Sequence, residues 1–378
     1  MKRIALYNAS WSSFGGGEKY LCVVADELSR DHGLDVRLVM DVPGITRERL
    51  RTYFNLPLER VHLEPCPRSA VRARLRSSDV CVIMSNFMPY GCPAFTTAYV
   101  LQIPYPPITA GTIATNLAAL NVREAGKNIL RLRLLRDARH AQGVITYSRF
   151  VADTLNLNHG VQTTVLHPPI DDFASTERKA RAILSVGRFF RGLYNNKRYD
   201  VLIDAFKQLY DRKINDGYEY WIAGSATDDD ATRLHLESLR ERAAGYPIVF
   251  SVNATYDAIR SLYARATIFW HAAGFDADER TQPERTEHFG MSTVEAMSAS
   301  CIPVVIRKGG QKEIVSHGES GYLWESQEEL IDYTASLIAF PERIQALQPR
   351  ARERSRTFDR SHFSDALRSF IRGLGLTA

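Results

Sequence analysis

The sequence contains no stretch of about 18 uninterrupted apolar residues, the length that a membrane-spanning helix requires. Its amino terminus, MKRIALYNAS, holds only a short apolar run before polar residues, so a signal peptide is not expected either. Five cysteines are scattered and lack C-x-x-C spacing, which argues against a disulfide framework and against a zinc site. These absences predict a cytoplasmic protein of a reducing compartment. Attachment to the cytoplasmic face of a membrane stays open.

Charge of one sign is not in excess either, since 48 lysines and arginines face 43 aspartates and glutamates, a net charge of +5. This balance does not demand nucleic acid as a partner, and basic and aromatic residues are not interleaved as nucleic-acid binding would need. It is compatible with anionic ligands or an anionic membrane surface. Repeats and low-complexity tracts are missing, and 45% hydrophobic residues is an ordinary globular value. A length of 378 residues predicts about two domains.

Basic residues gather around positions 68–76 and along the segment 123–139. In the second segment, helical spacing places Ile129, Leu132 and Leu135 on one apolar stripe. Two interpretations are open: a surface helix that docks on anionic lipid, or a helix whose apolar face packs on its own domain. The cations concerned are Arg123, Lys127, Arg131, Arg133, Arg136 and Arg139.

Apolar, β-rich runs alternate with helical patterns along the chain. The first series is IALYNA, VRLVMD, VCVIMS, TAYVLQ, GVITYS and TTVLHP, and the second is AILSVGRF, YEYWIAG, IVFSV, TIFWHA and IPVVI. Such alternation predicts right-handed βαβ units around parallel sheets. Between the series, the proline pair of LHPPIDD (166–172) favours an extended connector.

We therefore predict an α/β fold of two Rossmann-like, doubly wound domains that face each other across a cleft. The first domain is expected over residues 1–168 and the second over 169–358. A terminal amphipathic helix over 359–378 is expected to cross back onto the first domain. Ligands of such sheets bind outside the carboxyl ends of the strands, so residues that follow strands are the candidates for a site.

Two cations follow the strand that ends in SVG. Arg188 comes directly after Gly187, and Lys197 begins the next helix after a loop that contains Asn195 and Asn196. An arginine fork and a lysine point charge at these places suit a diphosphate. The alternative is a pair of exposed cations in a long loop.

The stretch EHFGMSTVEAMSASCIPVV (287–305) places Glu287 and Glu295 on either side of an expected helix start. Ser292 and Glu295 have the spacing of a capping box with Ser292 as the N-cap. Glu287 lies before the helix, and Gly290 permits close approach of the backbone to a ligand. We expect the amides of the helix start to hold a phosphate and the carboxylates to accept hydrogen bonds from sugar and ribose hydroxyls.

These residues resemble the retaining family-four, or group one, glycosyltransferases of the GT-B fold. The resemblance rests on E-x7-E with EHFG and EAMS, PVV with Gly309, Gly310 and Glu313, SVGR with Lys197, WIAGS, and FGGGEKYL. EHFG together with WHAAGF is similar to lipid-linked oligosaccharide mannosyltransferases and bacterial polysaccharide glycosyltransferases. The family implies a first domain that binds the acceptor and a second that binds the nucleotide sugar.

By this resemblance Arg188 and Lys197 bind the donor diphosphate and Glu287 the transferred sugar, and these three are the predicted catalytic residues. Glu295 binds the nucleotide ribose. The wider predicted donor site adds Gly15, Gly16, Gly17, Gly187, Gly224, His271, Phe289, Gly290, Met291 and Ser292. For His271, which follows a strand, a purely structural role stays open.

The chain departs from the family pattern in two places. Gln102 stands where many members have a histidine, so no histidine role is carried over there. Arg188 and Lys197 are nine positions apart, further than usual, which leaves Arg191 and Tyr194 between them unassigned. No metal or cofactor is expected, because the acidic loop before Glu287 lacks ligand spacing and resembles a solvated insertion. Its acids are Asp276, Asp278, Glu279 and Glu284.

The predicted function is transfer of a sugar, with retention, from GDP-mannose or a UDP-sugar to a hydroxyl of a glycan or lipid-linked acceptor. Two carboxylates could instead serve glycoside hydrolysis. Asp41, at the end of a strand, could bind the ribose of NAD in an oxidoreductase, although FGGGEK lacks the G-x-G-x-x-G spacing. A non-catalytic nucleotide-sugar-binding protein is the alternative from another class.

Overall fold

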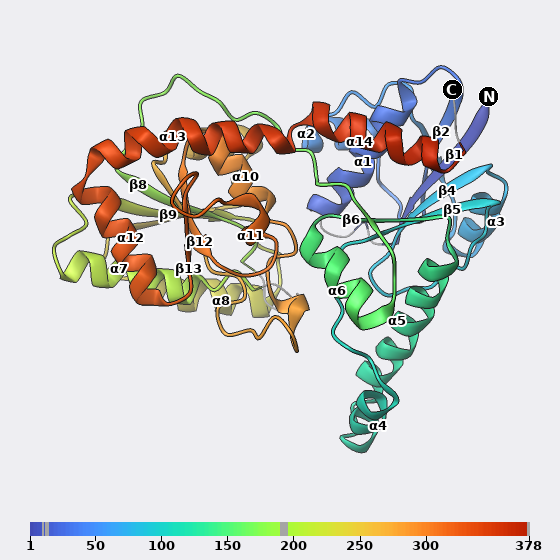
Figure 1. Cartoon of the computed structure of the whole chain (residues 1–378), viewed down its shortest axis with the longest axis horizontal. Helices are drawn as coiled ribbons and strands as arrows, with labels where there is room; N and C mark the ends of the chain where they lie inside the picture. The colour runs from blue at the N-terminus through green and yellow to red at the C-terminus, as the bar shows by residue number, and fades with distance from the viewer. Residues whose placement is uncertain (10, 12–14, 190–195, 376–378) are drawn as a thin grey trace. The chain divides into compact units, whose positions relative to one another are not determined.

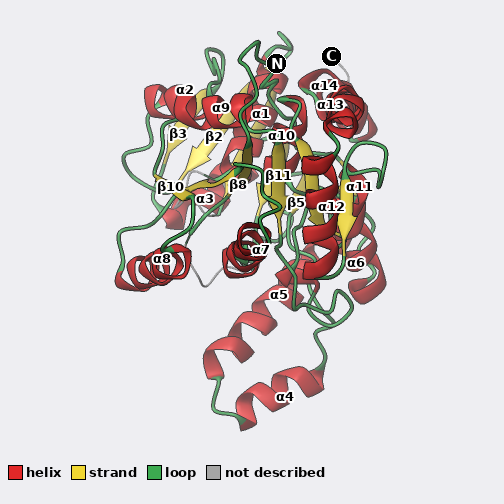
Figure 2. Ribbon diagram, turned by 90° about the vertical axis from the view of Figure 1, so that its left-hand side faces the viewer, coloured by secondary structure: helices red, strands yellow, loops and turns green. Residues whose placement is uncertain are grey.

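The computed structural model describes residues 1–9, 11, 15–189 and 196–375, and it divides the chain into two compact units. Unit 1 consists of Met1–Pro169 with Ser361–Ala378, and unit 2 consists of Ile170–Arg360. In each unit, helices pack around a parallel sheet (Figure 1 and Figure 2). Arg191, Tyr194 and Asn195 of the predicted diphosphate loop lie outside the described residues.

Unit 1 is built on a parallel sheet with the strand order β3-β2-β1-β4-β5-β6-β7. Its inner strands β4 and β5 are buried throughout, which explains their unbroken apolar runs in the sequence. The strands are β1 Lys2–Asn8, β2 Leu34–Met40, β3 His62–Pro65, β4 Val80–Met84, β5 Thr96–Leu101, β6 Gly143–Thr146 and β7 Thr164–Val165. The helices are α1 Gly16–Ser29, α2 Arg47–Phe54, η1 Arg68–Ala70, α3 Val71–Arg76, α4 Ala110–Ala118, α5 Val122–His140, α6 Arg149–His159 and α14 Arg360–Gly373.

Unit 2 is built on a parallel sheet with the order β10-β9-β8-β11-β12-β13. Its strands are β8 Ala182–Val186, β9 Glu219–Gly224, β10 Ile248–Val252, β11 Ile268–His271, β12 Ile302–Ile306 and β13 Tyr322–Trp324. Its helices are α7 Tyr199–Asp211, α8 Asp230–Ala243, α9 Tyr256–Arg265, η2 Pro283–Arg285, α10 Met291–Ser298, α11 Gln311–Ile314, α12 Gln327–Ala339, α13 Pro341–Ser355 and η3 Arg356–Phe358. No helix in the described part of the chain is both long and apolar enough to span a membrane.

The strand order reverses beside the first strand of each sheet. In unit 1, β1 has β2 on one side and β4 on the other, and in unit 2, β8 lies between β9 and β11. These sheets confirm the predicted α/β class with two doubly wound units. Ligands of such sheets bind at the carboxyl ends of the strands where the order reverses. In unit 2 this rule points to the ends of β8 and β11.

The terminal helix α14 belongs to unit 1. Its buried residues are Phe363, Leu367 and Ile371. The ring of Phe363 packs edge-on against Tyr20 with centroids 5.5 Å apart. Gly143 at the start of β6 leaves room for the same helix, because a Cβ there would lie 2.6 Å from Cζ of Phe370. The last helix therefore contributes to the core of the first unit.

The buried face of α5 differs from the predicted apolar stripe. The residues that face the core are Ala125, Asn128, Arg131, Leu134, Leu135 and Ala138. Ile129 is instead 41% exposed, so it does not belong to the face that packs on the domain. Arg131 can be buried because its Nη1 donates to Glu124 and to Asn128 at 2.7 and 2.6 Å. A buried arginine, paired through Nη1, thus lies on the face that the apolar pattern did not identify.

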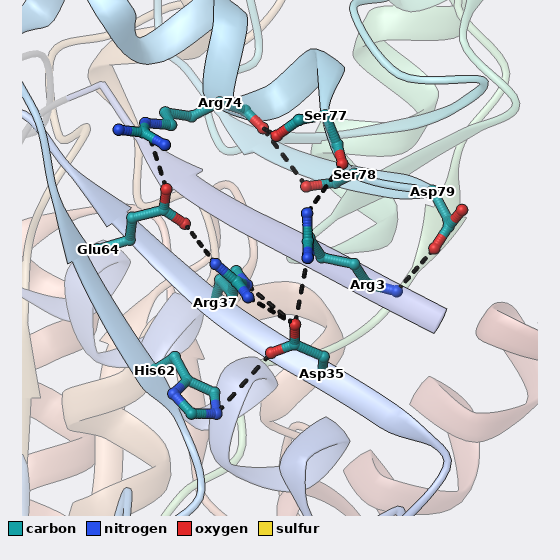
Figure 3. A network of polar contacts seen from close by, with 9 residues as sticks. All are labelled: Arg3, Asp35, Arg37, His62, Glu64, Arg74, Ser77, Ser78 and Asp79. Atoms are coloured by element: carbon teal, nitrogen blue, oxygen red, sulfur yellow. Dashed lines mark hydrogen bonds and ion pairs between the residues drawn. The ribbon is translucent and has the colours of Figure 1, made fainter. Parts of the chain in front are cut away.

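A polar network joins β1, β2, β3 and α3 at one edge of unit 1 (Figure 3). Arg37 donates to Asp35 at 2.9 Å and to Glu64 at 3.5 Å, and Arg74 pairs with Glu64 at 3.3 Å. Burial raises the pKa of Asp35, but hydrogen bonds from Arg37 and Arg3 outweigh burial and lower this pKa below its usual value. The network ties the edge strand β3 to its neighbours. Arg74, within the basic cluster at 68–76, is therefore engaged in the fold.

Candidate active site

Unit 2 brings several predicted site residues together at the carboxyl ends of β8 and β11. Gly187 and Arg188 follow β8, and His271 is the last residue of β11. Glu287 lies in the loop before α10, and Lys197 lies just before α7. These elements begin or end at the edge of the sheet where the strand order reverses.

A single carboxylate oxygen connects three of these side chains. Glu287 Oε2 forms an ion pair with Lys197 Nζ, and His271 Nε2 lies 2.9 Å from the same oxygen. The side chains of Lys197, Glu287 and His271 are only 13%, 11% and 3% exposed. Water therefore screens the charges of this cluster poorly, and each partner depends strongly on the others.

The protonation of the cluster follows from its surroundings. Burial alone would raise the pKa of Glu287, but the Lys197 charge and the His271 hydrogen bond hold this pKa well below its usual value. Burial lowers the pKa of His271, so its imidazole is neutral. Because an ionised carboxylate can only accept, Nε2–H of His271 donates to Glu287. Nδ1 of His271 is then a buried acceptor that has no partner among the described residues.

Glycines at the ends of β8 and β9 make room for this cluster. A Cβ on Gly187 would lie 2.9 Å from Cγ and Cε of Lys197 and from Oη of Tyr199. Glycine at 187 thus lets the lysine stem cross the strand end toward Glu287. A Cβ on Gly224 would lie 1.6 Å from the carbonyl oxygen of Gly187. Gly224 therefore shapes the site through backbone packing.

The start of α10 differs from the predicted capping box. Gly290, with φ of +118°, is the N-cap, so α10 begins at Met291 and Ser292 already lies in its first turn. Among the described residues no side chain caps this start, and the predicted capping role of Ser292 and Glu295 was wrong. Glu295 instead accepts a hydrogen bond from Tyr263 Oη at 2.9 Å. A helix start without a side-chain cap suits an anion.

The glycine pair after β12 fixes Glu287 through the backbone. Gly310 N–H donates to the carbonyl oxygen of Glu287 at 2.8 Å. A Cβ on Gly309 would lie 2.1 Å from that oxygen, and one on Gly310 would lie 2.5 Å from Cα of Phe289. Two residues without side chains are therefore required for this contact.

The acidic loop before Glu287 is only partly the predicted solvated insertion: Asp276 and Asp278 are exposed, but the loop is also tied to the fold. Lys308 Nζ donates to the carbonyl oxygens of Gly274, Phe275 and Ala277 at 3.0, 3.0 and 2.7 Å. Glu279 accepts from Lys312 Nζ at 2.8 Å. Sequence spacing could not reveal partners 31 to 34 positions away. Within the described residues, no three His, Cys, Asp or Glu side chains gather as a metal site would need.

Four buried polar side chains near this site have atoms without a hydrogen-bond partner among the described residues. They are His271 Nδ1, Tyr199 Oη, Thr293 Oγ1 and both amide atoms of Gln311. Gln311 is fully buried, and its Nε2 would lie 2.9 Å from a Cβ on Gly290 at the start of α10. Buried polar groups are usually paired, so this concentration favours a polar ligand. Tyr199, Thr293 and Gln311 could not be predicted as site residues from the sequence, because nothing in their spacing marks them.

The remaining predicted residues are placed as follows. Arg188 is half-buried, and its charge acts on Tyr199 and His288. Gly15, Gly16 and Gly17 lie in unit 1, where α1 begins, and a Cβ on Gly17 would lie 2.9 Å from Nε2 of Gln102. Their part in donor binding stays a prediction. Asp41 accepts a hydrogen bond from Tyr7 Oη at 3.1 Å.

Acid is expected to destabilise the fold through His271. The folded-state pKa of His271 is lowered, so below its ordinary value of 6.5 the unfolded chain binds a proton that the folded chain does not. Stability is thus fully present above pH 6.5 and falls as the pH drops, by at most about 1.4 kcal/mol per pH unit for this group. Urea unfolding between pH 7 and pH 5 should show a shallower pH dependence for His271→Gln. His32→Gln, at an exposed position, is the control and should keep the wild-type pH dependence. Equal slopes of unfolding free energy against pH for wild type and His271→Gln would contradict this account.

Comparison with known proteins decides the family. A family model described as Glycosyl transferases group 1 matches residues 170–354, nearly all of unit 2. Unit 2 is a group 1 glycosyl transferase domain. The family predicted from the motifs is thereby confirmed. The Lys197–Glu287–His271 cluster and the start of α10 both lie inside this glycosyl transferase domain.

Curated relatives of the glycosyl transferase domain include mannosyltransferases. GDP-Man:Man(3)GlcNAc(2)-PP-Dol alpha-1,2-mannosyltransferase of Dictyostelium discoideum is 29% identical over 237 residues, which is 59% of this chain and 45% of the relative. The Homo sapiens protein of the same name is 28% identical over 214 residues, 50% of this chain and 40% of the relative. The chain thus spans less than half the length of these relatives.

Solved structures extend the likeness to both units. Anabaena HepE in complex with UDP and glucose matches 98% of this chain and 100% of its own, with a TM-score of 0.68 and 15% identity. A glycosyltransferase from Rickettsia africae matches 100% of this chain and 99% of its own, with a TM-score of 0.69 and 14% identity. These likenesses confirm the α/β fold of two Rossmann-like units that is typical of GT-B glycosyltransferases.

Proposed function

We propose that this protein transfers a sugar from a nucleotide diphosphate to a hydroxyl of a glycan or lipid-linked acceptor. The observation that carries the proposal is the buried cluster of Lys197, Glu287 and His271 inside the glycosyl transferase domain. Orphaned polar atoms and a helix start without a side-chain cap lie close to it. Together these groups offer cationic, donor and acceptor atoms to a ligand that carries both phosphate and hydroxyls.

Different residues of the site bind different parts of the ligand. Arg188, Lys197 and the amides at the start of α10 bind the diphosphate and stabilise the charge that grows on it as the sugar leaves. Glu287, held ionised, accepts from sugar hydroxyls, and His271 fixes the orientation of its carboxylate. A bound diphosphate competes with Glu287 for Lys197. Glu295 accepts from the ribose, in line with the family pattern.

The reaction breaks the bond between the anomeric carbon and the donor phosphate oxygen and forms one to the acceptor oxygen. The acceptor proton passes to a donor phosphate oxygen, so the chain needs to supply no base of its own. Retention at the anomeric carbon follows the family resemblance. Glu287 is poorly suited to donate a proton as a hydrolase acid would, because its pKa is lowered.

GDP-mannose is proposed as the first donor to test, because the curated relatives are named for it. A UDP-sugar is the second, since HepE was solved with UDP and glucose. The acceptor is proposed only as a class. No metal or other cofactor is proposed, because in this proposal Arg188, Lys197 and the helix amides balance the charge of the diphosphate.

Nucleotide sugars are expected to raise the thermal midpoint of the purified protein, and NADH is not. A donor at a hundredfold excess over its Kd would add about 2.7 kcal/mol to the free energy of unfolding. Arg188→Ala should lower kcat for donor turnover by about 10²–10³-fold, because one oxyanion-type contact is lost. Midpoints and nucleoside diphosphate release are measured across a donor panel with acceptor mixtures.

The matched control is Arg181→Ala, at the amino end of the same strand β8, which should leave turnover unchanged. Binding without transfer to any acceptor would favour the non-catalytic nucleotide-sugar-binding alternative. No stabilisation by any nucleotide sugar would contradict the proposal outright.

A further inference from the structure

Helices α4 and α5 form a hairpin that stands out from unit 1. Figure 1 and Figure 2 both show α4 and the adjoining part of α5 beyond the rest of that unit. The hairpin follows β5 in the chain and returns to β6. No residue of α4 is buried, and none is charged. Although α4 lies against α5, a short helix with no buried residue and no charged face is stabilised little by packing or by water.

Leu120, in the turn between the two helices, has a backbone conformation and a side-chain exposure that are both unfavourable for leucine. It follows the C-cap of α4 in a Schellman turn, in which Asn121 N–H donates to Asn116 O at 2.8 Å and Leu120 N–H donates to Leu117 O at 3.0 Å. Glycine is usual at this position because the backbone is left-handed, and φ of Leu120 is +57°. The Leu120 side chain is also 86% exposed.

A second leucine, Leu58, shares the left-handed backbone conformation of Leu120 but lies in a different environment. Leu58 has φ of +49°, but its side chain is fully buried and its N–H donates to Asp26 Oδ1 at 2.9 Å. Burial and a hydrogen bond thus explain Leu58. Nothing among the described residues explains why position 120 carries a leucine. This points to a partner that does not belong to the fold.

The tip of the hairpin is an apolar surface. Besides Leu120, the side chains of Leu117, Val122 and Ile129 are 49%, 64% and 41% exposed. Single exposed apolar residues are ordinary, but here they follow one another around one turn and continue onto α5. The tip therefore presents a small apolar wedge to the surroundings.

Exposed cations begin beside this wedge at Arg123 and continue along α5, and the acids of the hairpin are already engaged. Arg123, Arg133, Arg136 and Arg139 on α5 are exposed. Glu124 accepts from Lys127 and Arg131 at 3.1 and 2.7 Å, and Asp137 accepts from Gly91 N–H at 2.8 Å. The accessible charge of the hairpin is therefore positive.

We propose that the α4–α5 hairpin docks on an anionic lipid bilayer, with its apolar tip at the acyl boundary and its arginines on lipid phosphates. An apolar wedge beside exposed cations has the chemistry of an interfacial membrane element. A second copy of the chain fits less well, because its arginines would meet like charges. Nucleic acid fits less well because residues 110–140 contain no Phe, Tyr or Trp side chain for stacking. The inference is independent of the proposed sugar transfer, since docking needs no donor.

The test is co-sedimentation of the full chain with phosphatidylcholine vesicles, with or without phosphatidylglycerol, in the absence of nucleotide sugar. We expect binding to the anionic vesicles only, weakening as salt rises. Leu120→Gly should weaken partitioning at least about tenfold, because one leucine side chain no longer leaves water. Each of Arg123→Gln and Arg133→Gln should weaken it about fivefold at low salt.

Leu120→Gly also separates docking from folding. Glycine relieves the left-handed backbone strain at position 120. The thermal midpoint of the Leu120→Gly variant should therefore equal or exceed that of wild type, while its vesicle binding falls. Leu157→Ser on α6, where the leucine is 84% exposed, and Arg51→Gln on α2 are matched controls that should bind like wild type. Wild type that stays in the supernatant, or Leu120→Gly that binds equally well, would overturn the proposal. Self-association without vesicles that Leu120→Gly abolishes would also overturn it, in favour of a second copy.

Discussion

Lys197→Met is expected to lower the free energy of unfolding by about 3–5 kcal/mol, because it removes the cation of a buried ion pair with the Glu287 carboxylate. His271, as a neutral donor, does not replace that charge. Urea unfolding at pH 7 measures the loss. The same variant should also lose donor turnover, since Lys197 is the cation proposed for the diphosphate.

The double variant Lys197→Met with Glu287→Gln should recover most of this stability, because the uncompensated charge is gone. It should not recover turnover. Lys312→Met is the surface control: its ion pair with Glu279 is 2.8 Å long but 44% and 28% exposed, so at most about 1 kcal/mol is expected. Equal losses for Lys197→Met and Lys312→Met would mean that Glu287 is effectively solvated.

Gly224→Ala is expected to cost at least about 3 kcal/mol, because its Cβ would lie 1.6 Å from a backbone oxygen of Gly187. No side chain can rotate away to relieve this clash, so the strands β8 and β9 would have to separate. Thermal and urea unfolding of the purified variant measure the effect, and failure to obtain folded protein agrees with it.

Gly126→Ala is the matched control. Gly126 lies inside α5, and a Cβ there meets nothing within 4 Å. Alanine should therefore stabilise the chain by up to about 1 kcal/mol. A Gly224→Ala protein as stable as wild type would show that the two strand ends are not packed as described.

The sequence predicted features that depend on local pattern. Strands buried on both faces appear as apolar runs, so their alternation with helices indicates two parallel sheets. Residues at or just beyond strand ends, such as His271 and Arg188, could be selected because ligands of these sheets bind there. The family motifs added Lys197 and Glu287.

Features that depend on distant partners could not be predicted. Glu295 has capping-box spacing, but Gly290 starts the helix earlier and Tyr263, 32 positions away, takes up the carboxylate. Gln311 is buried at the site without any sequence pattern to mark it. On α5, the engaged Arg131 hid the buried face. Each of these errors concerns a polar side chain whose place in the fold the apolar pattern of the sequence does not reveal.

The placement of α14 has a consequence for synthesis. Unit 1 contains both the first residues and the last helix, whose Phe363, Leu367 and Ile371 are buried. On the ribosome, the amino-terminal sheet must therefore wait, with part of its apolar surface uncovered, until all of unit 2 has been translated. The second unit is thus the first that can reach its final form.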